Sequence, residues 1–126
     1  MKKVYSEEEV FEQNPLVLAY VGDAVMTLYV REHMALSGFK VNKLNKLVSG
    51  IINAGKQAEI FLRIESTLNE REMDVARRAR NTNMHHMAKN YSVMDYRYAT
   101  SLEAVIGYLY LTNNQSRLNK ILGECV

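Results

Sequence analysis

LVLAYVGDAVMTLYV (residues 16–30) and YATSLEAVIGYLYLT (residues 98–112) are the two stretches that decide the fold. Both are apolar, have a helical pattern and carry a single charge, Asp23 in the first stretch and Glu103 in the second. An unpaired charge in an apolar setting costs several kcal/mol. We therefore expect a fold that retains two such charges to use them.

Small residues surround both acids: Ala19, Gly22 and Ala24 in the first stretch, and Ala99, Thr100, Ala104 and Gly107 in the second. Small faces let two helices approach closely, and this packing would bring the carboxylates together. Two such charges repel unless a proton or a cation lies between them. Hard oxygen ligands favour Mg²⁺ or Mn²⁺, so one interpretation is a metal site that hydrolyses phosphodiesters.

A structural interpretation of the two acids is equally open at this point. Asp23 and Glu103 would each pair with a cation, such as Arg97 or Lys56, and only stabilise a helical bundle. The sequence does not show whether the two faces meet.

Length and composition favour one domain spanning residues 1–126, since 126 residues with 48% hydrophobic and 24% charged side chains can form a real core. The only cysteine, Cys125, cannot form an internal disulfide, which predicts a reducing, cytoplasmic location. No apolar stretch follows the N-terminal lysines, so we expect no signal peptide. The run around Asp23 is too short to cross a membrane.

Capping residues and a scarcity of turn residues predict an all-α chain. Ser6 caps a short first helix, and Asn14-Pro15 begins a second that ends near Ser37, before Gly38. Further helices are predicted over 42–48, 52–65 (with Ala54, Ala58, Phe61 and Leu62 on its apolar side), 69–80, 95–111 and from 115 to about 123. Ser49-Gly50 is predicted to break or kink the chain between helices, and residues 81–94 are predicted to form a loop.

Two motifs resemble those of the ribonuclease III family. Leu18-Ala-Tyr-Val-Gly-Asp-Ala-Val25 is similar to its signature helix, and Leu102-Glu-Ala-Val-Ile-Gly-Tyr-Leu-Tyr-Leu111 is similar to its second, Glu-Ala-Leu-Ile-Gly helix. The likeness covers nearly the whole chain. No double-stranded-RNA-binding domain is expected after Val126, which indicates the short bacterial form, Mini-ribonuclease III. The segments 54–58, 77–81 and 96–98 also look like that subgroup.

The resemblance is incomplete at two positions of the acidic site. Full-length members of the family have a glutamate where this chain has Ala19 and an aspartate where it has Thr100. Only Asp23 and Glu103 carry over from the usual four carboxylates. The resemblance therefore implies a reduced shell of metal ligands, completed by water or RNA phosphate oxygens.

The resemblance implies a homodimeric endoribonuclease, dependent on Mg²⁺ (or Mn²⁺), that cuts double-stranded RNA and leaves 5′-phosphate and 3′-hydroxyl ends. Its implied substrate is precursor 23S ribosomal RNA, with a ribosomal protein on that RNA as a possible partner. Asp23 and Glu103 would be the catalytic metal ligands, and Tyr20 would lie at the two-fold dimer interface.

The segment 77–97 carries five basic residues and one acid and is predicted to contact RNA, whereas the whole chain has a net charge of only +2. The predicted contacts are Arg77, Arg78, Arg80, Lys89, Arg97 and Lys56, with Lys40, Lys43 and Lys46 as further candidates. His85-His86 has no second His/Cys cluster at ligand spacing, which argues against zinc and favours a loop role near RNA.

Two rival functions remain open from the sequence. The replacements at Ala19 and Thr100 are compatible with a non-catalytic module that binds double-stranded RNA through a degenerate metal site. A helical interaction protein whose acids form structural ion pairs is the third hypothesis.

Overall fold

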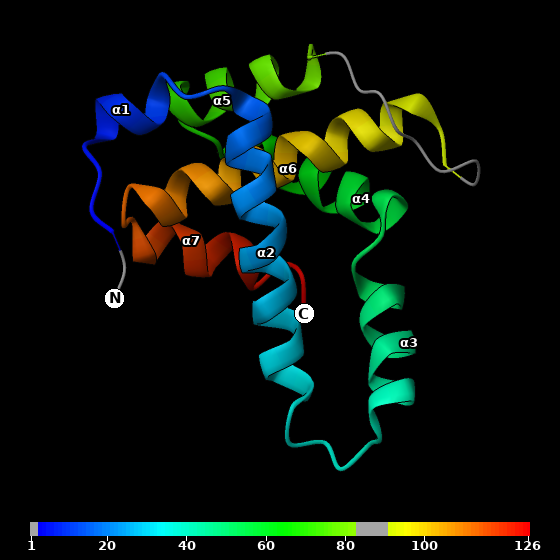
Figure 1. The fold of residues 1–126 in the computed structure, drawn as a ribbon. Coiled ribbons are helices and arrows are strands. Elements are labelled where there is room, and N and C mark those ends of the chain that lie inside the picture. The colour runs from blue at the N-terminus through cyan, green and yellow to red at the C-terminus, as the bar shows by residue number, and fades with distance from the viewer. Residues whose placement is uncertain (1–2, 83–90) are drawn as a thin grey trace.

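A computed structural model describes residues 3–82 and 91–126, and its described elements are helices without strands (Figure 1). The all-α prediction is confirmed. The helices are α1 (Glu7–Phe11), α2 (Pro15–Met34), α3 (Val41–Ile51), α4 (Ala54–Ile64), α5 (Glu70–Arg80), α6 (Val93–Leu111) and α7 (Gln115–Leu122), with a 3₁₀ turn, η1 (Glu65–Thr67). None of the described helices combines the length and the apolar character that a membrane crossing requires.

Helix α6 is the centre of the packing. Helices α1, α2, α4, α5 and α7 all contact it, and every residue from Ala99 to Leu109 is buried except Glu103. Burial of a helix over most of its circumference explains why its sequence is apolar on nearly every side. Glu103 is therefore the one ionisable residue in the middle of the most buried helix.

The second half of α2 and the whole of α3 extend from this body as an arm, with a turn at residues 35–40 (Figure 1). Helix α2 ends at Met34, three residues before the predicted end. Gly38 lies in the turn with φ of +87°, a conformation that glycine adopts without strain. The glycine thus shapes the turn and does not terminate the helix.

The predicted break at Ser49-Gly50 is wrong. Helix α3 continues through both residues to Ile51, and the chain changes direction at Ile52 and Asn53. The physical reason is Asn53, whose side-chain oxygen accepts from Lys56 N while its Nδ2 donates to Ser49 O. One side chain thereby ends α3 and begins α4.

Smaller corrections apply to the other helices. Helix α4 is shorter than predicted, and Leu62 on it is exposed, whereas Ala54, Ala58 and Phe61 are buried as predicted. Helix α6 begins two residues before Asp95, because Ser92 accepts from Asp95 N and provides the cap. The caps predicted at Ser6 and Asn14 are confirmed, and the helix predicted to begin at Asn69 has that residue as its cap.

Candidate functional site

Two glycines bring the backbones of α2 and α6 into contact. A Cβ atom added to Gly22 would lie 1.7 Å from the carbonyl oxygen of Glu103, and one added to Gly107 would lie 1.9 Å from that of Leu18. No side chain fits at such distances, so the helices can cross this closely only where both lack one. The crossing point falls beside the two acids, at Gly22 next to Asp23 and at Glu103 itself.

The crossing brings the Asp23 and Glu103 side chains close enough for Asp23 to raise the pKa of Glu103. Asp23 is exposed to solvent, whereas Glu103 is largely buried between the helices. Burial, the charge of Asp23 and a hydrogen bond to Asp23 raise the pKa of Glu103 to about 8, and a hydrogen bond from Gln57 opposes them. At neutral pH, Glu103 in the protein without a cation therefore mostly retains its proton.

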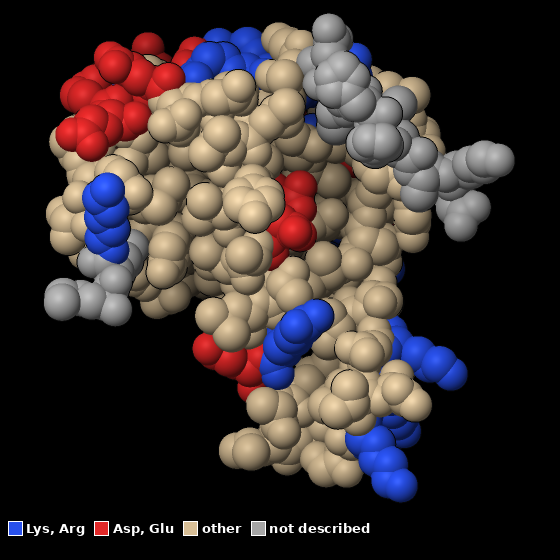
Figure 2. All heavy atoms as spheres, in the orientation of Figure 1, with Lys and Arg blue, Asp and Glu red and all other residues tan. Residues whose placement is uncertain are grey.

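The ion-pair interpretation of these acids does not fit the structure. Neither acid forms a salt bridge within the described residues. The two suggested cations have other partners, since Lys56 Nζ lies 3.9 Å from Glu59 and Arg97 donates to the carbonyl of Arg80 at 2.6 Å. The space-filling view shows a small recessed group of acidic atoms at the middle of one face, surrounded by uncharged atoms (Figure 2).

The donor set fits a hard divalent cation. It consists of carboxylate oxygens, one side chain is open to solvent, and the like charges need a proton or a cation between them. No group of three or more His, Cys, Asp and Glu side chains is found in the described part of the chain, so the pair is a sparse site. At the two positions where the acids are missing, Ala19 is buried and the Thr100 hydroxyl donates to Tyr96 O.

The predicted RNA contacts fall into two structural groups. Arg78 and Arg97 donate to backbone carbonyls at 2.6 Å, of Phe11 and Arg80 respectively, and Arg78 also binds Asp74. These contacts tie α5 to the end of α1 and α6 to the end of α5. RNA binding by the two arginines stays a prediction. The partly buried Arg80 lies 3.9 Å from Glu65.

The second group is exposed. Arg77 and Lys56 are open to solvent and form only loose pairs with acids on their own helices, at 3.6 and 3.9 Å. Exposed lysines are spaced three residues apart from the turn at the far end of the arm along α3: Lys40, Lys43 and Lys46. Basic atoms are visible on the arm in Figure 2. Lys89, His85 and His86 lie outside the described residues.

Sequence reasoning missed one residue of the site. Gln57, on α4, is buried, and its Nε2 lies 3.5 Å from Glu103 Oε2 and 3.8 Å from Met26 Sδ. The sequence did offer one signal for Gln57. It is a polar residue on the apolar side of α4, one residue before Ala58 and one turn before Phe61.

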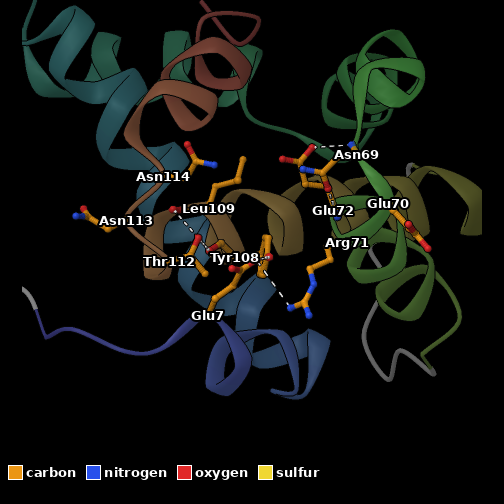
Figure 3. Close-up of a pocket in the computed structure, with 10 residues that line it drawn as sticks. All are labelled: Glu7, Asn69, Glu70, Arg71, Glu72, Tyr108, Leu109, Thr112, Asn113 and Asn114. Carbon is orange, nitrogen blue, oxygen red and sulfur yellow. Dashed lines mark hydrogen bonds and ion pairs between the residues drawn. The ribbon is translucent and has the colours of Figure 1, made fainter.

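A separate polar cavity of about 540 Å³ lies between α1, α5 and the α6–α7 turn (Figure 3). Three of the charged residues that line it have ionic or hydrogen-bonding partners: Glu7, Arg71 and Glu72. The fully buried Glu72 binds Arg117 at 2.7 Å and completes a capping box with Asn69, and Tyr108 donates to Glu7 at 2.9 Å. These pairs hold the ends of the helices together, so we assign the cavity a structural role.

Residues 16–114 of the chain match the family model of the ribonuclease III domain. The chain is 42% identical over 120 residues to a Mini-ribonuclease 3 of Clostridium tetani, covering 94% of this chain and 80% of that protein. It is 40% identical over 116 residues to the Mini-ribonuclease 3 of Streptococcus pneumoniae, covering 90% and 91% of the two chains. A crystal structure of a Fusobacterium nucleatum protein superposes with a TM-score of 0.83 at 33% identity, covering 89% of this chain and 90% of that one.

Proposed function

The chain belongs to the ribonuclease III family, as a member of its Mini-ribonuclease 3 group, and we propose that it is an endoribonuclease that cuts double-stranded RNA. Its active site in this proposal is formed by Asp23 and Glu103. One observation carries the proposal: Asp23 lies close enough to Glu103 at the helix crossing to raise its pKa, and neither carboxyl group forms a salt bridge with a cationic side chain of the described residues. Such a pair is costly to keep unless it binds a cation.

The two carboxylates have different tasks in this proposal. Glu103 is held by the buried α6, so it provides a fixed ligand, and its proton must leave to solvent when both groups act as ligands. Asp23 is exposed, so it can both bind the cation and orient a water molecule toward an RNA phosphate. Bound Mg²⁺ or Mn²⁺ would supply Lewis-acid activation of water and stabilisation of developing negative charge.

Exposed basic residues outside this pair provide the grip on RNA. The arm lysines Lys40, Lys43 and Lys46, together with Lys56 and Arg77, are exposed and can reach phosphates; Lys43 Nζ lies 4.0 Å from the centre of the Phe39 ring, and Lys56 and Arg77 form only loose ion pairs. A-form RNA is recognised mostly through phosphates and 2′-hydroxyls, so binding should be sensitive to salt. We infer, from the group to which the chain belongs, action in the cytoplasm on precursor 23S ribosomal RNA, with 5′-phosphate and 3′-hydroxyl products.

The outward face of α2 supports the proposed homodimer. It carries an exposed stripe at helical spacing, formed by Val17, Tyr20, Ala24 and Leu28, and no described element covers it (Figure 1). Tyr20 is 81% exposed, which is unusual for a large aromatic side chain beside a candidate active site. A second copy of the chain would bury this stripe and place two sites on one duplex.

Tyr20→Glu should weaken dimerisation by more than about 100-fold, because burying a new charge and losing an aromatic anchor cost about 3 kcal/mol or more at an interface. Sedimentation equilibrium measures the change. Leu36→Glu is the matched control, since Leu36 is 99% exposed after the end of α2, outside the stripe. A dimer of unchanged affinity in Tyr20→Glu would show that this stripe is not the interface.

The function is tested with purified protein and a labelled RNA duplex, with Mg²⁺ and with EDTA. The wild-type protein should cut only with Mg²⁺, and Asp23→Asn should bind the duplex but cut about a thousandfold more slowly. Asp95→Asn, in the first turn of α6, is the matched control and should cut normally.

Two other results would support the rival functions. If the wild-type protein binds the duplex but does not cut it in Mg²⁺ or Mn²⁺, the result supports the non-catalytic RNA-binding module. A protein that does not bind duplex RNA even at low salt is the helical interaction protein.

A further inference from the structure

Gln57 differs from the other buried polar side chains of the described residues in what it contacts. Glu72 pairs with Arg117, and the hydroxyls of Thr100 and Ser101 donate to backbone carbonyls. These three contacts serve the packing of the helices. The amide of Gln57 instead faces Glu103, one of the two carboxyl groups of the candidate site.

The position of Gln57 explains how one side chain can act on this site. It lies in the first turn of α4, next to the Asn53 cap, so its backbone is fixed. Its Nε2 reaches Glu103 on α6 and the sulfur of Met26 on α2, one turn beyond Asp23. The three helices α2, α4 and α6 thus meet around this amide.

A neutral amide is the chemical group that suits a positioning role here. A lysine or arginine would pair with Glu103 and compete with a cation, and another acid would add repulsion. An apolar side chain would leave the buried carboxylate without a donor, which costs about 1–3 kcal/mol or more for a charged group. Glutamine provides one donor without changing the charge of the site.

We propose that Gln57 is a positioning residue that orients the Glu103 carboxylate toward Asp23 and thereby raises the affinity of the pair for a divalent cation. This inference rests on the proposed function. Side chains that hold a metal ligand in place commonly contribute 10- to 100-fold to metal affinity. The amide itself does not need to touch the cation or the RNA.

The test measures Mn²⁺ affinity by electron paramagnetic resonance, without RNA, in the wild-type protein and in Gln57→Met. Methionine has a similar volume and flexibility but no N–H donor. The dissociation constant for Mn²⁺ should rise about tenfold. In cleavage assays the Mg²⁺ concentration for half-maximal rate should rise by a similar factor, while KM for the duplex stays unchanged.

The matched control is Gln115→Met, on α7. The Gln115 amide also makes a 3.5 Å contact, but with the neutral Asn113. The Mn²⁺ affinity of the Gln115→Met protein should equal that of the wild-type protein. If Gln57→Met fails to fold, Gln57→Leu replaces it in the same measurement.

An unchanged Mn²⁺ affinity in a folded Gln57 variant, within about twofold, would overturn the positioning role while leaving the proposed function in place. A loss of thermal stability with unchanged Mn²⁺ affinity would likewise show that Gln57 only packs. A wild-type protein that neither binds Mn²⁺ nor cuts duplex RNA would instead contradict the proposed function.

Discussion

Gly22→Ala should unfold at a far lower temperature than the wild-type protein and should lose the contact between Asp23 and Glu103. The added Cβ would lie 1.7 Å from the carbonyl oxygen and 2.7 Å from the carbonyl carbon of Glu103. Both are backbone atoms of the buried α6, which cannot turn aside as a side chain can. Helices α2 and α6 must separate, and we expect a loss of about 3 kcal/mol or more in the free energy of unfolding.

Gly50→Ala is the matched control, because the same methyl group in α3 would meet nothing within 4 Å. Alanine is favoured over glycine inside a helix, so this variant should be as stable as the wild type or about 0.5–1 kcal/mol more stable. Urea unfolding followed by circular dichroism measures both. Equal stabilities of Gly22→Ala and Gly50→Ala would contradict the close helix crossing.

Glu103→Gln should abolish cleavage and, at the same time, stabilise the cation-free protein at alkaline pH. In the folded wild-type protein the pKa of Glu103 is raised to about 8, from 4.5 for an ordinary carboxyl, mainly by burial and then by Asp23. The folded state therefore keeps a proton that the unfolded chain releases. Wild-type stability should fall as pH rises from about 4.5 through about 8.

A glutamine cannot titrate, so this part of the pH dependence should vanish in Glu103→Gln. We expect its free energy of unfolding to exceed that of the wild type by about 3 kcal/mol near pH 8.5 without divalent cations. Cleavage should fall about a thousandfold, since one of two cation ligands is lost. Adding Mg²⁺ should stabilise the wild type at this pH and leave the variant unchanged.

Glu59→Gln is the control for these measurements, because Glu59 is exposed on α4 and its one ion pair within residues 3–82 and 91–126 is with Lys56 at 3.9 Å. It should keep the wild-type pH dependence and the wild-type cleavage rate. If Glu103→Gln instead follows the wild-type curve of stability against pH, Glu103 does not hold the proton that the structure assigns to it.

The helical fold could be predicted from sequence because its causes are local, whereas the sequence left open whether the two acids meet. Caps such as Asn14 and Asn69 identify helix starts, and glycines beside Asp23 and after Glu103 indicate a close crossing. The end of α3 was not predictable in the same way. Ser49-Gly50 is a common break, but the Nδ2 of Asn53 reaches back to Ser49 O, a contact that only the folded turn shows.

Long-range contacts account for what the sequence did not reveal at the site. Gln57 is 46 residues from Glu103 in sequence, and nothing in the local pattern shows that its amide reaches α6. Arg78 similarly looked like a free cation in a basic run, whereas its guanidinium binds the carbonyl of Phe11, 67 residues away. A side chain's partner depends on packing between elements, and residue type alone does not specify it.

The pairing of Asp23 with Glu103 as ligands for one divalent cation is tested most directly by anomalous diffraction from wild-type crystals grown with Mn²⁺. We predict a Mn²⁺ peak in contact with both carboxylates at the α2–α6 crossing, and no peak there in crystals of Asp23→Asn. Wild-type crystals that show no Mn²⁺ peak at the α2–α6 crossing, grown from protein that cuts duplex RNA in Mn²⁺, would contradict the shared cation site.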